Sequence, residues 1–421
     1  MTGLRLAAEC GGMNPESVSF ALPPRLRAIH EAEFPRFSDA EMQRRRAAIA
    51  GLLLEAGLDH LVFCGANRFG SAVQWLTGWP VTAEAVGVFT PGKPDAMFVQ
   101  HVNHVPLARR LAAPAEVAWG GGSCIEAAIA ALEQRAAKHG RVGVIGPMTF
   151  EQHGMLAAKF GTIANLNRRY VRLRQVKSAE ELDWMRIGAA LTDRGMMALR
   201  DGLRPGLSER DLAELVERAY IALGGTNVIH FFGVTAMDNP NLGVPTQFVA
   251  NRNVARGDIV FAEISAAFWE HPGQVLRSFA VKDDPPQLYR DLHAVADAAF
   301  DAVAKVLKAG AMPQEVIAAA GVIEDSGFTI IDDLLHGYGG GYLPPVLGSR
   351  SLPPPYPPPR AGEGREGVVP DEPFRAGMTV VIQPNVVTLD GKAGVQTGEM
   401  VLITETGIAP MHAVPRGFVR I

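Results

Sequence analysis

Glu263 is the first residue in this chain whose type and position could do chemistry. It lies on a predicted strand between apolar neighbours such as Phe261 and Ile264, and a carboxylate on a buried strand is rare without a partner. Burial raises the pKa of a carboxylic acid, which suits a general acid or base near neutral pH. We therefore predict that Glu263 is catalytic; the alternative is a structural ion pair with Arg277.

His336 is the second candidate, at the start of the glycine-rich segment 336–342. Glycines allow a backbone or a ligand to approach closely, and an imidazole that titrates near neutral pH can transfer protons. We predict that His336 is catalytic rather than a core histidine. Tyr338 and Tyr342 are predicted to line the same cavity, where their hydroxyls could donate to a developing oxyanion. The alternative for both phenols is aromatic packing.

Two glutamines complete the candidate site. Gln274 and Gln383 each offer a donor and an acceptor without charge, so they could hold a carboxylate, an amide or a carbonyl of a substrate. The equally supported alternative is that both glutamines only pack in the interior and bind no substrate. Arg277 follows Gln274 by three residues and is expected to order the scaffold, whereas strand alternation directs Glu399 to the opposite face.

The order and spacing of these segments resemble the pita-bread hydrolase family, which includes Xaa-Pro dipeptidases, aminopeptidase P, methionine aminopeptidases and creatinase. The segments that carry the resemblance are 257–263, 274–279, 336–339, 377–384 and 394–405. The resemblance implies a pita-bread catalytic domain with five metal-ligand positions, which read Asp, Asp, His, Glu and Glu in metal-dependent members. In this chain the five positions are Glu263, Gln274, His336, Gln383 and Gly398.

This substituted set argues against the usual metal chemistry. Two hard divalent cations need carboxylate oxygens, and two cations held by a single carboxylate would repel each other in a closed pocket. We therefore predict no metal and no other cofactor, with one weakly held metal on Glu263 and His336 as the alternative.

The resulting prediction is a metal-independent hydrolase that cleaves a C–N bond in a small molecule, as creatinase does within the family. Three alternatives stay open. They are a metal-dependent Xaa-Pro dipeptidase or aminopeptidase, a lyase that acts on a small zwitterionic substrate, and a non-catalytic binding module.

Two further residues are assigned to substrate binding by comparison with the family. Relatives place a substrate-facing histidine before the first segment, but residues 243–246 read Gly-Val-Pro-Thr; His230 or His271 could replace it, and His230 is our candidate. Arg68 precedes the stretch 75–78, which in dimeric relatives belongs to a loop that reaches the partner's active site. We therefore expect a homodimer in which Arg68 binds an anionic group of the substrate.

The length of 421 residues suggests two domains. Residues 1–170 alternate short strands (61–64, 86–90, 96–99, 142–146) with helices (38–56, 125–138), which predicts an α/β domain. Residues 171–421 are predicted to form the α+β pita-bread domain, with helices at 174–201, 208–223, 288–307 and 313–325 and strands at 259–267, 275–282, 378–383 and 400–405. The Pro/Gly-rich segment 353–369 is predicted to be an inserted loop rather than a ligand for a proline-binding domain.

The amino-acid composition indicates which classes of partner the protein has and in which cellular compartment it acts. Hydrophobic content of 48% with 20% charged residues is typical of a globular protein, and a net charge of −4 without basic blocks argues against nucleic-acid binding. Three widely spaced cysteines form no disulfide framework or zinc pattern. Without a signal peptide or an apolar run of about 20 residues, the predicted location is the cytoplasm, and no membrane partner is expected.

Overall fold

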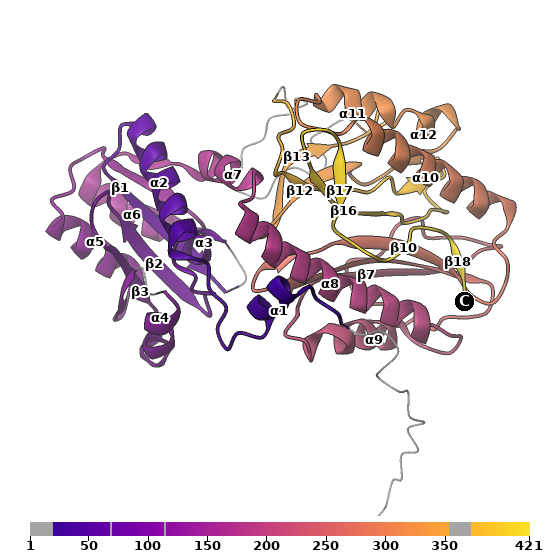
Figure 1. Ribbon diagram of the computed structural model, residues 1–421, viewed down its shortest axis with the longest axis horizontal. Coiled ribbons are helices and arrows are strands. Elements are labelled where there is room, and N and C mark those ends of the chain that lie inside the picture. The colour runs from indigo at the N-terminus through magenta and orange to yellow at the C-terminus, as the bar shows by residue number, and fades with distance from the viewer. Residues whose placement is uncertain (1–19, 68–69, 113–114, 353–371) are drawn as a thin grey trace, which may run out of the picture.

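The structure is a computed structural model that describes residues 20–67, 70–112, 115–352 and 372–421. Two parts of the chain lie side by side (Figure 1): one is built on residues 60–165 and the other on residues 226–420. Arg68 and the predicted inserted loop 353–369 lie outside the described residues. None of the helices within the described ranges has the length and apolar character to cross a membrane.

A six-stranded mixed sheet forms the N-terminal part. Its strands are β1 (His60–Ala66), β2 (Glu84–Phe89), β3 (Asp95–Val99), β4 (Ala115–Trp119), β5 (Val142–Ile145) and β6 (Ile163–Asn165). They lie in the order β4-β3-β2-β1-β5-β6, with β1 antiparallel to β2 and parallel to β5. Alternate side chains of these strands contribute to two separate hydrophobic clusters, one on each face of the sheet.

Helices cover both faces of this sheet, which confirms the predicted α/β class. They are α2 (Asp39–Ala56), α3 (Ala72–Thr77), the 3-10 helix η1 (Val102–His104), α4 (Val105–Leu111), α5 (Cys124–Gln134), α6 (Phe150–Phe160) and α7 (Asn167–Gln175). The short first helix, α1 (Pro24–His30), packs instead against the C-terminal part, where Leu26 joins a hydrophobic cluster. Ser38 caps α2 as expected, because its side chain accepts a hydrogen bond from the Glu41 backbone. Helix α5 ends earlier than the predicted residue 138, since Ala136 has a φ of 56° that no right-handed helix allows.

The stretch 75–78, which was expected to reach a partner subunit, is helical at its start, and the expected contact with a partner stays a prediction. It forms the last turn of α3 and its glycine C-cap, and Trp75 is buried with its Nε1 donating a 2.9 Å hydrogen bond to Glu181 Oε1 of the same chain. The indole therefore ties the N-terminal part to the rest of its own chain.

A ten-stranded curved sheet forms the C-terminal part. Its strands are β7 (Thr226–Ala236), β8 (Asp258–Phe268), β9 (His271–Pro272), β10 (Val275–Ala280), β12 (Leu335–Tyr338), β13 (Tyr342–Leu347), β14 (Thr379–Ile382), β16 (Gly398–Ile403), β17 (Ile408–Pro410) and β18 (Val419–Arg420). The main path is β13-β12-β14-β16-β10-β8-β7. A separate pair consists of β11 (Thr329–Ile330) and β15 (Val386–Val387). This sheet and its helices match the predicted pita-bread class.

Two groups of helices cover this sheet (Figure 1). The helices are α8 (Ala179–Gly202), α9 (Glu209–Ile221), α10 (Gln287–Val306), α11 (Pro313–Ala319) and α12 (Val322–Asp325). Side chains of α8 and α9 pack against one hydrophobic cluster of the sheet, and those of α10, α11 and α12 pack against another. The predicted helix 313–325 is split, because Ala320 and Gly321 separate α11 from α12. The predicted helix 174–201 begins only after its N-cap, Ser178.

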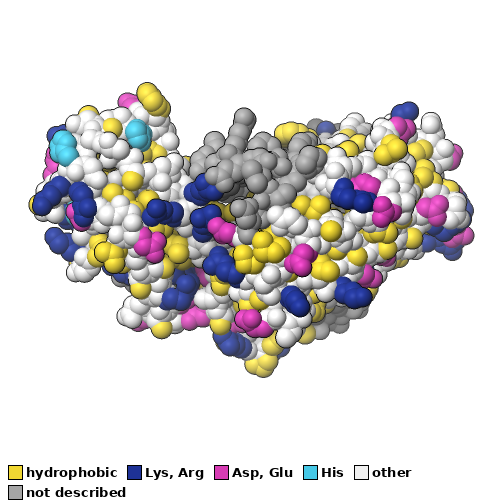
Figure 2. Space-filling view, turned by 90° about the horizontal axis from the view of Figure 1, so that it is seen from above, with side chains coloured by type: hydrophobic (Ala, Val, Ile, Leu, Met, Phe, Trp, Pro, Cys, Tyr) yellow, Lys and Arg dark blue, Asp and Glu magenta, His cyan; other side chains and the backbone are white. Residues whose placement is uncertain are grey.

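The surface of the described residues carries mixed charge. On the face shown in Figure 2, basic and acidic side chains are interspersed over both parts of the chain. This face therefore presents no extended basic surface among its described residues of the kind that nucleic acids bind.

Candidate functional site

Neighbouring strands of the curved sheet bring the five ligand-matched positions together. Glu263 lies on β8, His336 on β12 and Gly398 at the start of β16. Gln274 and Gln383 stand just outside β10 and β14. Since β12, β14, β16, β10 and β8 are consecutive in the sheet, residues separated by more than 100 positions in the sequence share one face.

Glu263, Gln274 and Gln383 form a chain of side-chain hydrogen bonds. Gln274 Nε2 lies 2.7 Å from Glu263 Oε1 and 3.5 Å from Gln383 Oε1. Gln383 Nε2 in turn donates to the carbonyl of Asp333 at 3.2 Å. The amide nitrogens are thus directed at acceptors inside the site, while Gln274 Oε1 is buried without a hydrogen-bond partner among the described residues.

His412 holds the backbone of Gln274 in place. Its Nε2 accepts a 3.2 Å hydrogen bond from the Gln274 backbone N–H, and its Nδ1 lies 2.7 Å from Asp193 Oδ1. These two contacts define a neutral ring with the proton on Nδ1. Nothing in the local sequence signalled this histidine, because its partners lie more than 130 residues away in the chain.

Glu263 is 7% exposed, and no cationic side chain in the described ranges forms an ion pair with it. Burial, assisted by the nearby charge of Asp332, raises the pKa of Glu263 to about 8, so the carboxyl is protonated at neutral pH. The predicted alternative, an ion pair with Arg277, is wrong. Arg277 instead lies on the other face of the sheet, where its Nη2 is 2.6 Å from Glu399 Oε2, as expected for a residue that orders the scaffold.

His336 is 2% exposed and lies between two aromatic rings. The ring of Tyr342 stacks on it at 4.3 Å, and the ring of Tyr338 meets it edge-on at 5.4 Å. Burial lowers the pKa of His336 to about 4, so the imidazole is neutral near pH 7. Its Nδ1 is 3.1 Å from the carbonyl of Gly337. Because a carbonyl only accepts, this bond requires a proton on Nδ1 and leaves Nε2 as an acceptor.

The two tyrosines differ in what their hydroxyls contact. Tyr338 OH lies 2.7 Å from Ser265 Oγ, which ties this phenol into the packed floor of the site. Tyr342 OH is buried, and its polar neighbour is the carboxyl group of Asp333. Burial and the neighbouring Asp333 raise the pKa of Tyr342, so its hydroxyl stays protonated and can donate.

Asp332 and Asp333 are functional candidates that the sequence reasoning missed. Asp332 Oδ2 lies 3.5 Å from Gln383 Nε2, and Asp333 is buried with one carboxyl oxygen lacking a partner within the described ranges. Burial, and then the nearby Asp332, raise the pKa of Asp333. The available signal was a pair of adjacent acids shortly before His336, but only the fold turns them toward Gln383.

His230 does not join this group. It pairs across the sheet with Ile264, which packs toward α8 and α9, so its side chain lies on the face opposite to Glu263. His230 Nδ1 is 2.7 Å from Glu217 on α9. The prediction that His230 binds substrate is therefore not supported by its position.

His271 lies in the contact between the two parts of the chain. Its Nδ1 is 2.8 Å from the carbonyl of Trp269, and its ring packs on Phe37 and Trp184. Burial lowers the pKa of His271 to about 4. Like His230, His271 therefore makes its contacts away from Glu263 and His336.

The residues at the five positions do not fit a pair of divalent cations. The set offers a carboxyl that burial protonates, one imidazole and two amides. With the present backbone, position 398 has no room for a metal-binding side chain, because a Cβ on Gly398 would lie 2.3 Å from the carbonyl oxygen of Ile382. In the described part of the chain, no group of three or more His, Cys, Asp or Glu side chains is arranged to hold a metal ion.

Comparison with known proteins defines the class. The profile of metallopeptidase family M24 matches residues 183–405, which is more than half of the chain, so this protein belongs to that family. Its sequence is 26% identical over 258 residues to the probable dipeptidase PepE of Mycobacterium tuberculosis, covering 58% of this chain and 60% of the relative. It is 23% identical over 236 residues to the Xaa-Pro dipeptidase of Pyrococcus furiosus, covering 56% of this chain and 62% of that protein.

The chain thus spans only about three fifths of the length of these curated relatives. Solved structures match more of it. The X-Pro aminopeptidase of Thermotoga maritima superposes with a TM-score of 0.74 at 16% identity, covering 89% of this chain and 99% of that one. Dipeptidase PepE of Mycobacterium ulcerans gives 0.73 at 22% identity, covering 91% and 99%. At such identities the structural likeness shows the fold.

Proposed function

We propose that this protein is a hydrolase that cleaves a C–N bond in a small molecule without a metal ion. The observation that carries the proposal is the hydrogen bond from Gln274 Nε2 to Glu263 Oε1. Where metal-dependent relatives have two carboxylates facing cations, these side chains satisfy each other instead. The sequence likeness to dipeptidases supports hydrolysis as the type of reaction.

The proposed reaction uses His336 and Glu263 as a base and an acid. Water attacks the carbon of the scissile bond while Nε2 of neutral His336 takes one of its protons. Protonated Glu263 gives its proton to the departing nitrogen, which keeps the electron pair of the broken bond. Transfer of a proton from His336 back to Glu263 restores both groups. Two titratable groups whose pKa values are displaced in opposite directions by burial suit these opposite roles.

The surrounding polar groups supply binding and orientation. Gln274 Oε1 offers an acceptor, since it has no hydrogen-bond partner among the described residues. The Tyr342 hydroxyl, which lies beside the Asp333 carboxyl, offers a donor. On the Gln383 side, the carboxylate of Asp332 and the backbone carbonyl of Asp333 add further acceptors. We infer that these acceptors favour a substrate with a cationic or strongly donating group near the scissile bond.

Metal analysis of the purified protein, with activity measured before and after chelation, tests the proposal. We expect metal well below one equivalent and unchanged turnover in the presence of a chelator. Near-stoichiometric manganese, iron, cobalt or zinc, lost together with activity, would overturn it.

A metal-dependent Xaa-Pro dipeptidase is the second candidate, favoured by the sequence likeness to the Pyrococcus enzyme. Turnover of Xaa-Pro dipeptides that needs added metal would select it. A lyase would release products without taking up oxygen from ¹⁸O-labelled water. A binding module would keep its physiological activity in both Glu263→Gln and His336→Ala variants.

We also propose that the protein acts in the cytoplasm and that it is a homodimer, the latter on the resemblance of residues 75–78 to dimeric relatives. Light scattering coupled to size exclusion tests the assembly, and a mass of one chain would contradict it.

A further inference from the structure

A cavity of about 620 Å³ lies between the two parts of the chain. Ser71 and Gln74 line it from the N-terminal part, Val228 and Pro272 from the curved sheet, and Arg174 from α7. Its volume falls within the range of roughly 300–1,000 Å³ that is typical of sites for drug-sized ligands. It is far larger than a single water or one amino-acid side chain requires.

The cavity reaches the candidate active site at Tyr342. This residue lines the cavity, and its ring stacks on His336 with 4.3 Å between ring centres. Gly340 and Gly341 line the same wall. A ligand that contacts Tyr342 in the cavity would therefore lie on the other side of one aromatic ring from His336.

The walls of the cavity combine neutral polar side chains with a larger apolar surface. Asn67, Ser71, Gln74, Thr82 and Asn167 supply amides and hydroxyls, and valines and prolines supply most of the apolar lining. Such a mixture suits the alternating amides and small side chains of a peptide-like chain.

Among the described residues of the lining, Arg174 is the only basic one and Glu270 the only acidic one. The Nη2 atom of Arg174 donates to the carbonyls of Gly339 and Gly340 at 2.6 and 2.9 Å. These bonds fix the guanidinium but do not neutralise it, and no described carboxylate forms an ion pair with it. A fixed guanidinium favours a carboxylate ligand, which it can bind through paired hydrogen bonds.

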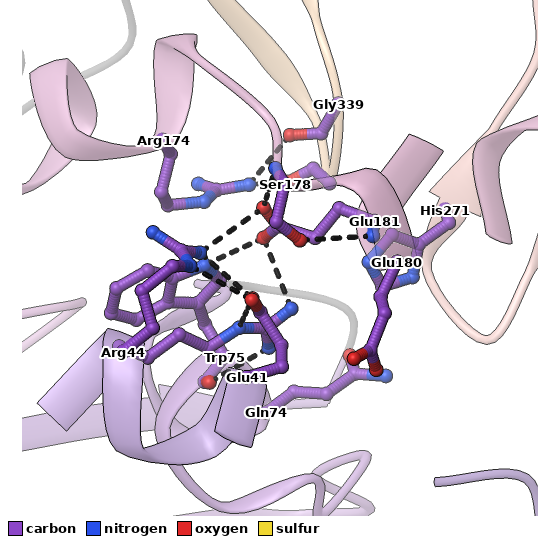
Figure 3. A network of polar contacts seen from close by, with 12 residues as sticks. Glu41, Arg44, Gln74, Trp75, Arg174, Ser178, Glu180, Glu181, His271 and Gly339 are labelled. Atoms are coloured by element: carbon purple, nitrogen blue, oxygen red, sulfur yellow. Dashed lines mark hydrogen bonds and ion pairs between the residues drawn. The ribbon is translucent and has the colours of Figure 1, made fainter. Parts of the chain in front are cut away.

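A buried network of ion pairs and hydrogen bonds joins the two parts of the chain that form the cavity (Figure 3). Arg45 is 1% exposed and contacts Glu41 at 2.6 Å and Glu181 at 3.1 Å, while Trp75 also donates to Glu181. Gln74 Nε2 donates to the carbonyl of Trp269 at 3.0 Å. Because both parts of the chain contribute to this network, the cavity between them is built into the fold.

We propose that this cavity is a distal subsite for the part of the substrate remote from the scissile bond, and that this part is a peptide-like chain ending in a carboxylate paired with Arg174. The inference rests on the proposed function only in placing the scissile bond beside His336. It deepens that function by naming an extended, acid-terminated amide as the substrate class.

Calorimetric binding to the full chain tests the proposal. The measurement uses the His336→Ala variant, which prevents turnover, so binding is read independently of how the bond is cleaved. The probes are N-acetyl-tetra-alanine, its C-terminal amide, and N-acetylalanine. We expect the long acid to bind at least about tenfold more tightly than either of the other two. Equal affinities for the acid and its amide, or for the long and short acids, would overturn the proposal.

Substitutions of residues that line the cavity provide a second test of the proposal. Val228 is 42% exposed and lines the cavity, whereas Ile221 is 55% exposed on α9 and lies outside the lining. Val228→Trp should abolish the advantage of the long acid, and Ile221→Trp should preserve it. Arg174→Met should weaken the acid by about tenfold and leave the amide unchanged, which tests the subsite without enlarging any side chain. An advantage of the long acid that survives both Val228→Trp and Arg174→Met would contradict the assignment.

Discussion

Gln274 Nε2 and Glu263 Oε1 lie 2.7 Å apart in a buried hydrogen bond. A carboxylate at position 274 would face Glu263 with like charge and would need cations to compensate it. The amide instead donates to the carboxyl, and burial keeps that carboxyl protonated near neutral pH. An amide in place of a carboxylate at position 274 thus turns a pair that would need cations into a neutral, hydrogen-bonded pair.

The pH dependence of turnover should be bell-shaped. His336 acts as the base only when unprotonated, so activity should fall as the pH drops through about 4, its pKa in the fold. Glu263 acts as the acid only when protonated, so activity should fall as the pH rises through about 8. The check is kcat/KM measured across pH, with chain stability verified at each pH.

Glu263→Gln should remove the proton donor and lower kcat by about 10²–10⁴-fold. Its upper pH limb should disappear, because glutamine does not titrate. Asp297→Asn is the matched control, since it neutralises an acid on α10 outside the site. An upper limb retained in Glu263→Gln would assign that pKa to another group.

The same substitution should stabilise the protein at alkaline pH. The folded-state pKa of Glu263 is raised from 4.5 to about 8, so its contribution to stability is complete below about pH 4.5 and is lost as the pH rises toward 8. Glutamine keeps the shape and stays neutral, which removes this loss. Urea unfolding at pH 5 and pH 8.5 should therefore show a gain of the order of 1–3 kcal/mol for Glu263→Gln at the higher pH only. A gain of equal size at pH 5 would contradict this explanation.

Gly398→Ala should destabilise the sheet. The new Cβ would lie 2.3 Å from the Ile382 carbonyl oxygen and 2.9 Å from the Gln383 Cα, so β14 and β16 must separate. Overpacking of this kind costs about 1–3 kcal/mol, measurable by thermal or urea unfolding. Gly51→Ala is the control, because that glycine lies within α2 with nothing near the new methyl, and alanine favours a helix. Equal stability of the two variants would show that the sheet accommodates a side chain at 398.

Glu399→Gln should destabilise the fold without changing the pH profile of turnover. Arg277 is 2% exposed and pairs with Glu399 at 2.6 Å, so removing the charge leaves a buried guanidinium without its anion, at a cost of about 3–5 kcal/mol. Asp283→Asn breaks an exposed pair with Arg256 and should change stability by about 1 kcal/mol or less. A shift of either pH limb in Glu399→Gln would mean that this pair acts on the site.

The sequence predicted which residues lie on the site strands, but not what each side chain contacts. The spacing of Glu263, Gln274, His336 and Gln383 indicated a single site because a family resemblance supplied the strand order. Local patterns also located α2 by its Ser38 cap and indicated that Glu399 turns away from Glu263. These features depend on neighbours within a few residues, which the sequence displays directly.

Only the tertiary structure determined which residues each of these side chains contacts. Alternation along β7 shows that neighbouring residues face opposite sides, but only the sheet order shows that His230 shares the face of Ile264 and contacts Glu217. The approach of Asp332 to Gln383 joins residues 51 positions apart, and the cavity at Arg174 exists only where the two parts of the chain meet. Contacts of this range depend on how the whole chain packs, because no local pattern encodes which distant surface a side chain meets.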